Sequence, residues 1–487
     1  MKIGQTSLVV FISKLVGSAL GFVATIYFAR VLGAEVIGIY SVIIALVAWL
    51  GLAGRLGVSK AIKKRVSEGK SEGEYLAAGT VLLVSSSIIL SVLIVLLRDP
   101  VERYVGAFNQ YSSISVVWFL VLLLMAYLSF SLVTSALIGQ RSVHIAGPLR
   151  PTRIAVQSVV QVILVFIGFG LVGMLLGYAL GTILITLLGI VFVSGQLRKP
   201  ASHHFRSLLA YAKFSWLGGL KSRAFNDVDI LVLGALVPQN LVGIYAVAWS
   251  LTKFLDLFGV AVSQTMFPEI SNVSAQESVE SAAGLIEDSL TYGGFIVIPG
   301  VIGGTLLSDR LLRIYSAEFI QGTEVFWLLL LSILFYTYLQ QQLNALNAVD
   351  RPDAAFRVNI IFVASNVVLN IILIWQIGWV GAAVASVTAS GLGLVLSYTL
   401  LAQTLPLSIP FDEIGRQWIS ALLMGGIVWG FENLIESAGL IQHNFATVCL
   451  LVGVGSFVYF VFLLAISTKF RATVNRNIPV DPPYPRI

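Results

Sequence analysis

The sequence predicts an all-α polytopic membrane protein with fourteen transmembrane helices, arranged as two pseudo-symmetric six-helix lobes plus two extra helices. Three observations predict this class. The 487 residues are 57% hydrophobic and only 11% charged, whereas a soluble domain carries about 25% charged residues. Apolar runs long enough to cross a hydrocarbon core of about 30 Å recur along the chain. Segments of the first half are also matched in the second half at a nearly constant offset.

The predicted spans follow one another through short connections. The first apolar run is about 20 residues long, which exceeds the apolar core of a cleaved signal peptide, so we interpret it as the first span. Tight breaks at Val172–Gly173 and Gly378–Trp379 each separate two neighbouring spans. The predicted spans are residues 8–29, 36–57, 75–97, 113–138, 154–172, 174–195, 214–236, 241–264, 289–307, 323–347, 358–377, 379–402, 416–435 and 445–467.

Basic residues are distributed unevenly between the predicted connections. With the N-terminus inside, loops 58–74, 139–153 and 196–213 and the C-terminal tail hold most of the lysines and arginines. The inner segments then carry about four times as many as the outer ones, as the positive-inside rule requires. Loop 268–288 is acidic, but acidic residues weigh little in that rule. We therefore expect a multi-pass protein of the cytoplasmic membrane with both termini cytoplasmic.

An internal repeat divides the chain. VIGIYSV at 36–42 matches LVGIYAV at 241–247, ALIG at 136–139 matches ALNA at 345–348, and VGMLLGYALG at 172–181 matches VGAAVASVTA at 380–389. The three offsets lie between 205 and 209 residues, and parallel repeats of this kind place a binding site at their interface. We predict an N-lobe over 1–205, a C-lobe over 206–405, and two further spans with the tail over 406–487.

The seventh span, Phe214–Val237, is the most informative segment. Lys221, Arg223, Asp227 and Asp229 lie about 10 to 22 Å from its start. Each unpaired charge at such depth costs about 2.5–3.5 kcal/mol. We therefore expect this helix to line a hydrated cavity. The alternative, which we favour less, is a purely structural network of ion pairs.

Spacing separates these charges into two kinds. Arg223 and Asp227 are four residues apart and can pair on one helix face. Lys221 has no acidic residue three or four positions away, which leaves it freer to meet an anionic ligand.

Other charges in the predicted spans are further candidates for the cavity. Lys253 and Asp256 are three residues apart, so a structural pair is at least as plausible as a site. Lys14 is shallow enough to extend to the headgroups, and it can equally point into the cavity. For Arg55, one turn from the end of its span, extension to the headgroups is favoured.

Several kinds of chemistry find no support. One cysteine, Cys449, excludes a disulfide within one chain, and the four histidines lack metal-ligand spacing. We expect no metal, no cofactor, no catalytic residue and no nucleic-acid partner. The first six spans contain no aspartate or glutamate, whereas a cation-coupled drug exporter would use a buried carboxylate there. Basic charge alone suits a phosphate-bearing lipid.

Three motifs carry a resemblance to a known family. ARVLGAEVIGIYSV at 29–42, ALIGQR at 136–141 and FPEIS at 267–271 resemble segments of bacterial and archaeal polysaccharide transporters. These belong to the multidrug/oligosaccharidyl-lipid/polysaccharide exporter superfamily, and fourteen spans match its lipid-linked oligosaccharide flippases. The resemblance implies two six-helix lobes around a central cavity that alternates between inward-open and outward-open states.

The resemblance also implies a function. It indicates a flippase for a polyprenyl- or dolichyl-phosphate-linked oligosaccharide in surface polysaccharide or glycan assembly. Lys14, Lys221 and Arg223, with Arg55 and Lys253, would hold the substrate. Membrane lipids and glycan-assembly enzymes are the other expected partners. Two alternatives stay open: a multidrug or small-solute exporter, and, less favoured, a membrane glycan polymerase or ligase.

Overall fold

The computed structural model describes residues 3–215, 217–438 and 443–477, and within this part of the chain every regular element is a helix. Eleven of the described helices or helix groups are long and apolar enough to cross a membrane. The protein is therefore an all-α, multi-pass membrane protein, as predicted. The chain divides into two compact units, Met1–Ala246 and Val247–Ile487, and the boundary falls inside helix α10.

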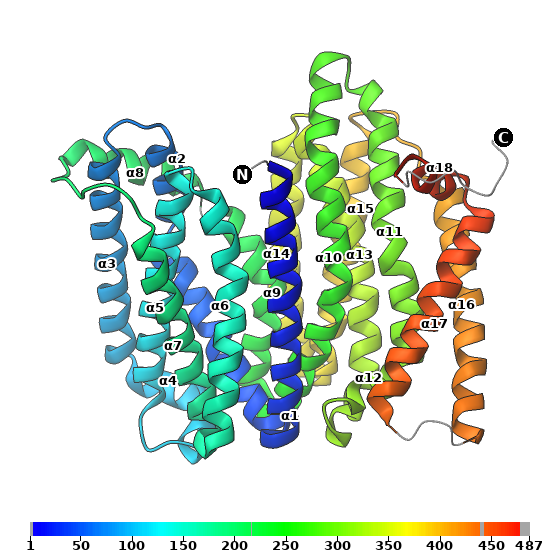
Figure 1. Ribbon diagram of the computed structural model, residues 1–487, viewed down its shortest axis with the longest axis horizontal. Helices are drawn as coiled ribbons and strands as arrows, with labels where there is room; N and C mark the ends of the chain where they lie inside the picture. Colours follow the sequence, from blue (N-terminus) through cyan, green and yellow to red (C-terminus); the bar gives the residue numbers. More distant parts are fainter. Residues whose placement is uncertain (1–2, 216, 439–442, 478–487) are drawn as a thin grey trace. The chain divides into compact units, whose positions relative to one another are not determined.

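Unit 1 carries most of the N-terminal half. Its longer helices run up and down, whereas α2 and α8 are short helices at one end of the unit (Figure 1). The elements of unit 1 are α1 (Ile3–Arg55), α2 (Val58–Ser67), α3 (Glu72–Leu96), α4 (Arg98–Tyr104), η1 (Gly106–Gln110), α5 (Val116–Gly139), α6 (Val143–Leu164), η2 (Val165–Phe169), α7 (Gly170–Val191), α8 (Ser202–Ser215), α9 (Leu217–Leu236) and the first residues of α10 (Gln239–Gln276).

Two bends explain why predicted neighbouring spans merge. Gly33, with φ 80° and ψ 174°, interrupts α1 between the first two predicted spans. Gly168 and Gly170, both with positive φ, connect α6 to α7 through η2. Glycine adopts this backbone region without steric cost, so each bend reverses or redirects the chain without a separate loop. The count of fourteen spans stays a prediction.

Two matched motifs of the repeat pack against each other within unit 1. A Cβ added at Gly38 would lie 1.9 Å from the carbonyl oxygen of Gln239, and one at Gly243 would lie 1.9 Å from the carbonyl oxygen of Ala34. Gly38 and Gly243 are 205 positions apart, as are Ala34 and Gln239, so the crossing is reciprocal. Only glycine permits backbones to approach this closely.

Unit 2 contains the remaining helices. They are the rest of α10, η3 (Glu280–Ala282), α11 (Ala283–Leu306), α12 (Ser308–Arg313), η4 (Ala317–Gly322), α13 (Thr323–Ala348), α14 (Pro352–Ile377), α15 (Val380–Ala402), α16 (Phe411–Ala438), α17 (Asn444–Ile466) and α18 (Thr468–Asn477). The helices α13, α14 and α15 pack closely together, and α11 packs against both α13 and α16.

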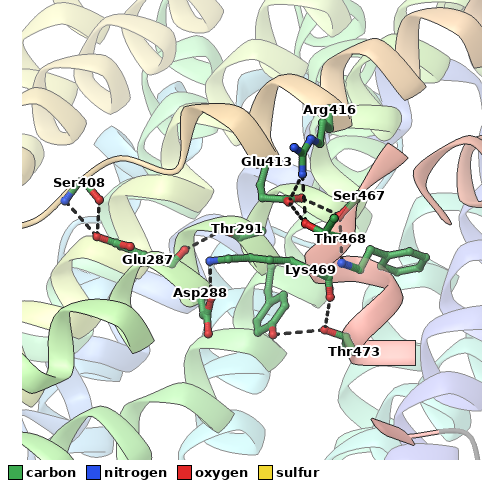
Figure 2. Close-up of polar contacts among 12 residues, drawn as sticks. Glu287, Asp288, Thr291, Ser408, Glu413, Arg416, Ser467, Thr468, Lys469 and Thr473 are labelled. Carbon is green, nitrogen blue, oxygen red and sulfur yellow. Dashed lines mark hydrogen bonds and ion pairs between the residues drawn. The ribbon is translucent and has the colours of Figure 1, made fainter. Parts of the chain in front are cut away.

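A polar cluster attaches α18 to the helices beside it (Figure 2). The carboxylate of Glu413, on α16 and 6% exposed, accepts hydrogen bonds from Arg416 at 2.6 Å and Ser467 at 2.6 Å. Lys469 of α18 pairs with Asp288 of α11 at 2.6 Å. A buried carboxylate with several donors fixes the junction of α17 and α18 to the start of α16.

Candidate functional site: a basic cluster in unit 1

The charged helix α9 holds one internal ion pair. Arg223 Nη1 lies 2.8 Å from Asp227 Oδ2, and the two side chains are 29% and 16% exposed. The i,i+4 pairing considered from the sequence is therefore present. It neutralises part of the charge of α9 and keeps the Arg223 guanidinium in a defined position.

Asp229 lies in a different environment on the same helix. This residue is 3% exposed, and its carboxylate accepts a hydrogen bond from the hydroxyl of Tyr245 on α10. A buried carboxylate requires such a donor. This contact places Asp229 in the packing of α9 against α10.

Arg55 ends α1 and lies among other cations. Its Nε donates a hydrogen bond to the Gly51 carbonyl at 3.0 Å, and its Cζ lies 5.1 Å from the ring centroid of Tyr127 on α5. Arg150 of α6 and Arg223 of α9 are close enough to repel the Arg55 charge. The structure thus brings together two residues predicted from separate spans, Arg55 and Arg223.

Lys63 of α2 extends this group of cations. Burial, and then the charges of Arg150, Arg55 and Lys60, lower the pKa of the Lys63 ammonium below its usual value. Desolvation and neighbouring positive charge both disfavour the charged form of a lysine. We call Arg55, Lys63, Arg150 and Arg223 the basic cluster.

Tyrosine and glutamine side chains line the neighbouring part of unit 1. Arg153 Nη1 lies 3.4 Å from the Tyr178 hydroxyl and its Cζ lies 4.9 Å from the Phe130 ring centroid. Further along α6, Gln161 donates a hydrogen bond to the Tyr40 hydroxyl at 2.9 Å. These groups offer hydroxyls and aromatic faces beside the cations, which suits sugar rings and phosphates alike.

The basic cluster has an excess of positive charge. Of its four members, only Arg223 forms an ion pair within the described residues. No aspartate or glutamate occurs between Glu102 and Asp227, whereas ten lysines and arginines do. This long acid-free stretch supplies α5 to α8, so an anion is the ligand that would offset the repulsion.

Four predicted residues are not among the members of the basic cluster. The side chains of Lys14 in α1 and Lys221 in α9 lie outside the described residues. Lys253 and Asp256 belong to the part of α10 in unit 2, where the Lys253 Nζ lies 5.6 Å from the Trp249 ring centroid. The assignment of these residues to the cavity stays a prediction.

Sequence reasoning missed Lys63 and Arg150, because it places both in loops. In the structure Lys63 lies within helix α2. Arg150 lies within helix α6, which begins at Val143. Pro148 and Pro151 lie inside α6, although proline is disfavoured in a helix interior. The span is predicted to begin at residue 154 because the apolar run starts only after Arg153. The acid-free stretch between Glu102 and Asp227 is the signal that points to Arg150, whereas Lys63 lies before it.

The chemistry available here is recognition of anions. In the described part of the chain, no group of three or more His, Cys, Asp or Glu residues is placed to hold a metal ion. Guanidinium groups bind phosphate oxygens with two parallel hydrogen bonds, and an ammonium adds a point charge.

Comparison with known proteins now gives the family. The model of the polysaccharide biosynthesis protein family matches residues 3–274. The chain belongs to this family. A probable flippase, AglR of Haloferax volcanii, is 30% identical over 484 residues, which cover 98% of each chain. The probable low-salt glycan biosynthesis flippase Agl15 of the same organism is 28% identical, covering 98% of this chain and 99% of that one.

Solved structures show the same fold for this family member. The lipid II flippase MurJ in an inward closed conformation matches 96% of this chain and 99% of its own, with a TM-score of 0.74 and 19% identity. An inward-facing multidrug resistance transporter of the MATE family matches 79% of this chain and 95% of its own, with a TM-score of 0.56 and 15% identity. The predicted membership and fold class are confirmed, and the chain is homologous to glycan biosynthesis flippases.

Proposed function

We propose that this protein is a flippase that moves a polyprenyl- or dolichyl-phosphate-linked oligosaccharide across the cytoplasmic membrane for surface polysaccharide or glycan assembly. The observation that carries the proposal is the basic cluster of unit 1, in which Arg55, Lys63 and Arg150 form no ion pair with an acidic side chain of the described residues. Homology to glycan biosynthesis flippases over nearly the whole chain supports it.

The residues suggest how such a substrate is held. Arg55, Arg150 and Arg223 bind the oxygens of the phosphate, and the anion offsets the repulsion on the charged form of Lys63. Tyr127 stacks under a cation or a sugar ring. The lipid tail remains in the bilayer while the glycan crosses a hydrated path, and the lobes alternate in exposing it to each side.

Orientation and organisation complete the proposal. The basic end of unit 1, with α2 and α8, faces the cytoplasm, and both termini lie there. The lobes extend over 1–205 and 206–405, followed by two appended spans. Lys14, Lys221, Lys253 and Asp256 remain candidates for the same path. The protein acts as a transporter and not as an enzyme.

A sidedness experiment tests this function. A fluorescent lipid-linked oligosaccharide is reconstituted with the protein into sealed vesicles, and a membrane-impermeant quencher reports the fraction in the outer leaflet. We expect the protein to bring the inner-leaflet fraction within reach of the quencher. Chemical change of the same lipid by the protein in detergent would indicate the polymerase or ligase. Movement of small cationic dyes without the lipid would indicate the solute exporter.

A further inference from the structure

Helix α8 lies across one end of unit 1 (Figure 1), where it packs against α2 and α3. Leu208 and Ala212 are 0% and 2% exposed and pack with residues of α2 and α3. His204 stacks edge-to-face on Tyr75 of α3, with ring centroids 4.8 Å apart. The helix is therefore firmly attached through this face.

The opposite face of α8 is basic. His203, Arg206 and Lys213 are exposed and follow one another at spacings of three and seven residues, which places them on one side of a helix. Arg198 and Lys199, shortly before the helix, are exposed as well. No acidic residue lies in α8 or in the segment 192–201.

Exposed apolar side chains flank this basic face. Leu209 is 50% exposed, Tyr211 is 40% exposed, and Leu197 in the preceding segment is 66% exposed. A helix that combines basic residues with exposed apolar and aromatic ones is typical of the membrane–water interface, where the apolar groups enter the headgroup boundary.

We propose that α8 and the segment 192–201 bind the headgroups of anionic phospholipids in the adjacent leaflet. Arg206, Lys213 and the Arg198–Lys199 pair meet the phosphates, while Leu209 and Tyr211 enter the headgroup boundary. Charge complementarity favours this occupant, because a basic surface beside a leaflet attracts anionic lipid. The inference goes beyond the proposed function, since it concerns lipid that is bound and not transported.

Hydrogen bonds link α8, the proposed lipid-binding helix, to α2, which carries a member of the basic cluster. Lys60 Nζ donates to the Ser215 carbonyl at 2.9 Å, and Ser215 Oγ donates to the Gly57 carbonyl at 3.2 Å. These bonds join the end of α8 to the start of α2, which carries Lys63. Lipid on α8 therefore helps to fix the position of α2.

Lipid titration tests the proposal. The full chain in neutral detergent is titrated with phosphatidylglycerol or phosphatidylcholine, and lipid binding is measured by native mass spectrometry. Arg206→Gln/Lys213→Gln is compared with Arg351→Gln/Arg357→Gln, which removes equal charge from exposed arginines of unit 2. We expect phosphatidylglycerol to bind about fivefold more weakly for each charge removed from α8. Equal losses in both variants would overturn the site.

Hydrogen exchange of the unaltered chain gives a second test. In nanodiscs that contain phosphatidylglycerol, the backbone amides of α8 should exchange more slowly than in nanodiscs of phosphatidylcholine alone. Equal exchange in both would refute the proposal. Protection by inorganic phosphate in phosphatidylcholine nanodiscs to the same extent would also refute it, because the site would then bind a free anion or an acidic segment of a protein.

Discussion

At the scale of single residues, Lys63 shows how binding and stability oppose each other. Its pKa is lowered by burial and by Arg150, Arg55 and Lys60, so its charged form is less favourable in the folded protein than in the unfolded chain. The unfolded chain holds the same proton up to a pH of about 10.4. Between the lowered pKa and that value the unfolded state binds more protons, so the ligand-free protein becomes more stable as pH rises through this window.

Replacing Lys63 should separate the two effects. We expect Lys63→Met to raise the thermal stability of the ligand-free protein at neutral pH, to flatten the rise of stability with alkaline pH, and to slow flipping about tenfold. Melting curves from neutral to alkaline pH measure the first two effects. Lys70→Met, at an exposed lysine beside the same helix, is the control. A melting temperature lowered in the Lys63 variant alone would contradict this account.

At the scale of elements, the crossing at Gly38 and Gly243 depends on the absence of side chains. A Cβ 1.9 Å from a carbonyl oxygen forces the helices apart. We expect Gly38→Ala and Gly243→Ala each to destabilise the protein by about 3 kcal/mol, the upper end of the usual cost of overpacking. Thermal unfolding in detergent measures this loss. Gly453→Ala, in α17 with nothing within 4 Å of the added atom, should be neutral, and equal behaviour of all three would refute the crossing.

The attachment of α18 to α16 should depend on the carboxylate of Glu413. Removing the buried Glu413 carboxylate leaves Ser467 without its acceptor and Arg416 without its ion-pair partner (Figure 2). We expect Glu413→Ala to cost about 3 kcal/mol and to speed hydrogen exchange in α18. Glu287→Ala, at a less buried carboxylate bonded to Ser408, should change little. Unaltered exchange in the Glu413 variant would show that α18 is held by other contacts.

At the scale of the whole molecule, the sequence predicted what depends on composition and spacing. Apolar runs predicted the membrane helices, and i,i+4 spacing predicted the pair of Arg223 with Asp227. Contacts between distant segments were not predictable, since nothing in the spacing of Asp229 indicates Tyr245. The short helices α2 and α8 were missed for a related reason: their apolar faces are too short to resemble spans, and they are buried only by neighbouring helices.

Orientation belongs to this scale as well. In a Cys449→Ser background, Lys70→Cys marks the connection of α2 to α3 and Ser112→Cys marks the connection before α5. The positive-inside rule places the first in the cytoplasm and the second outside. A membrane-impermeant maleimide should therefore label Ser112→Cys in intact cells and Lys70→Cys only in inverted vesicles. The reverse pattern would invert the proposed topology.

The basic cluster of unit 1 is central to the proposed function, because the proposal assigns it to the phosphate of the lipid-linked oligosaccharide. The most direct measurement is the initial flipping rate in sealed vesicles for Arg55→Gln/Arg150→Gln against Arg351→Gln/Arg357→Gln, at matched reconstituted amounts. Removing two guanidinium groups from the cluster should lower the rate at least about 100-fold, since a hydrogen bond to a charged group is worth about 1.5–3 kcal/mol, while the control keeps the rate of the unaltered protein. A cluster variant that flips at the unaltered rate would contradict the account.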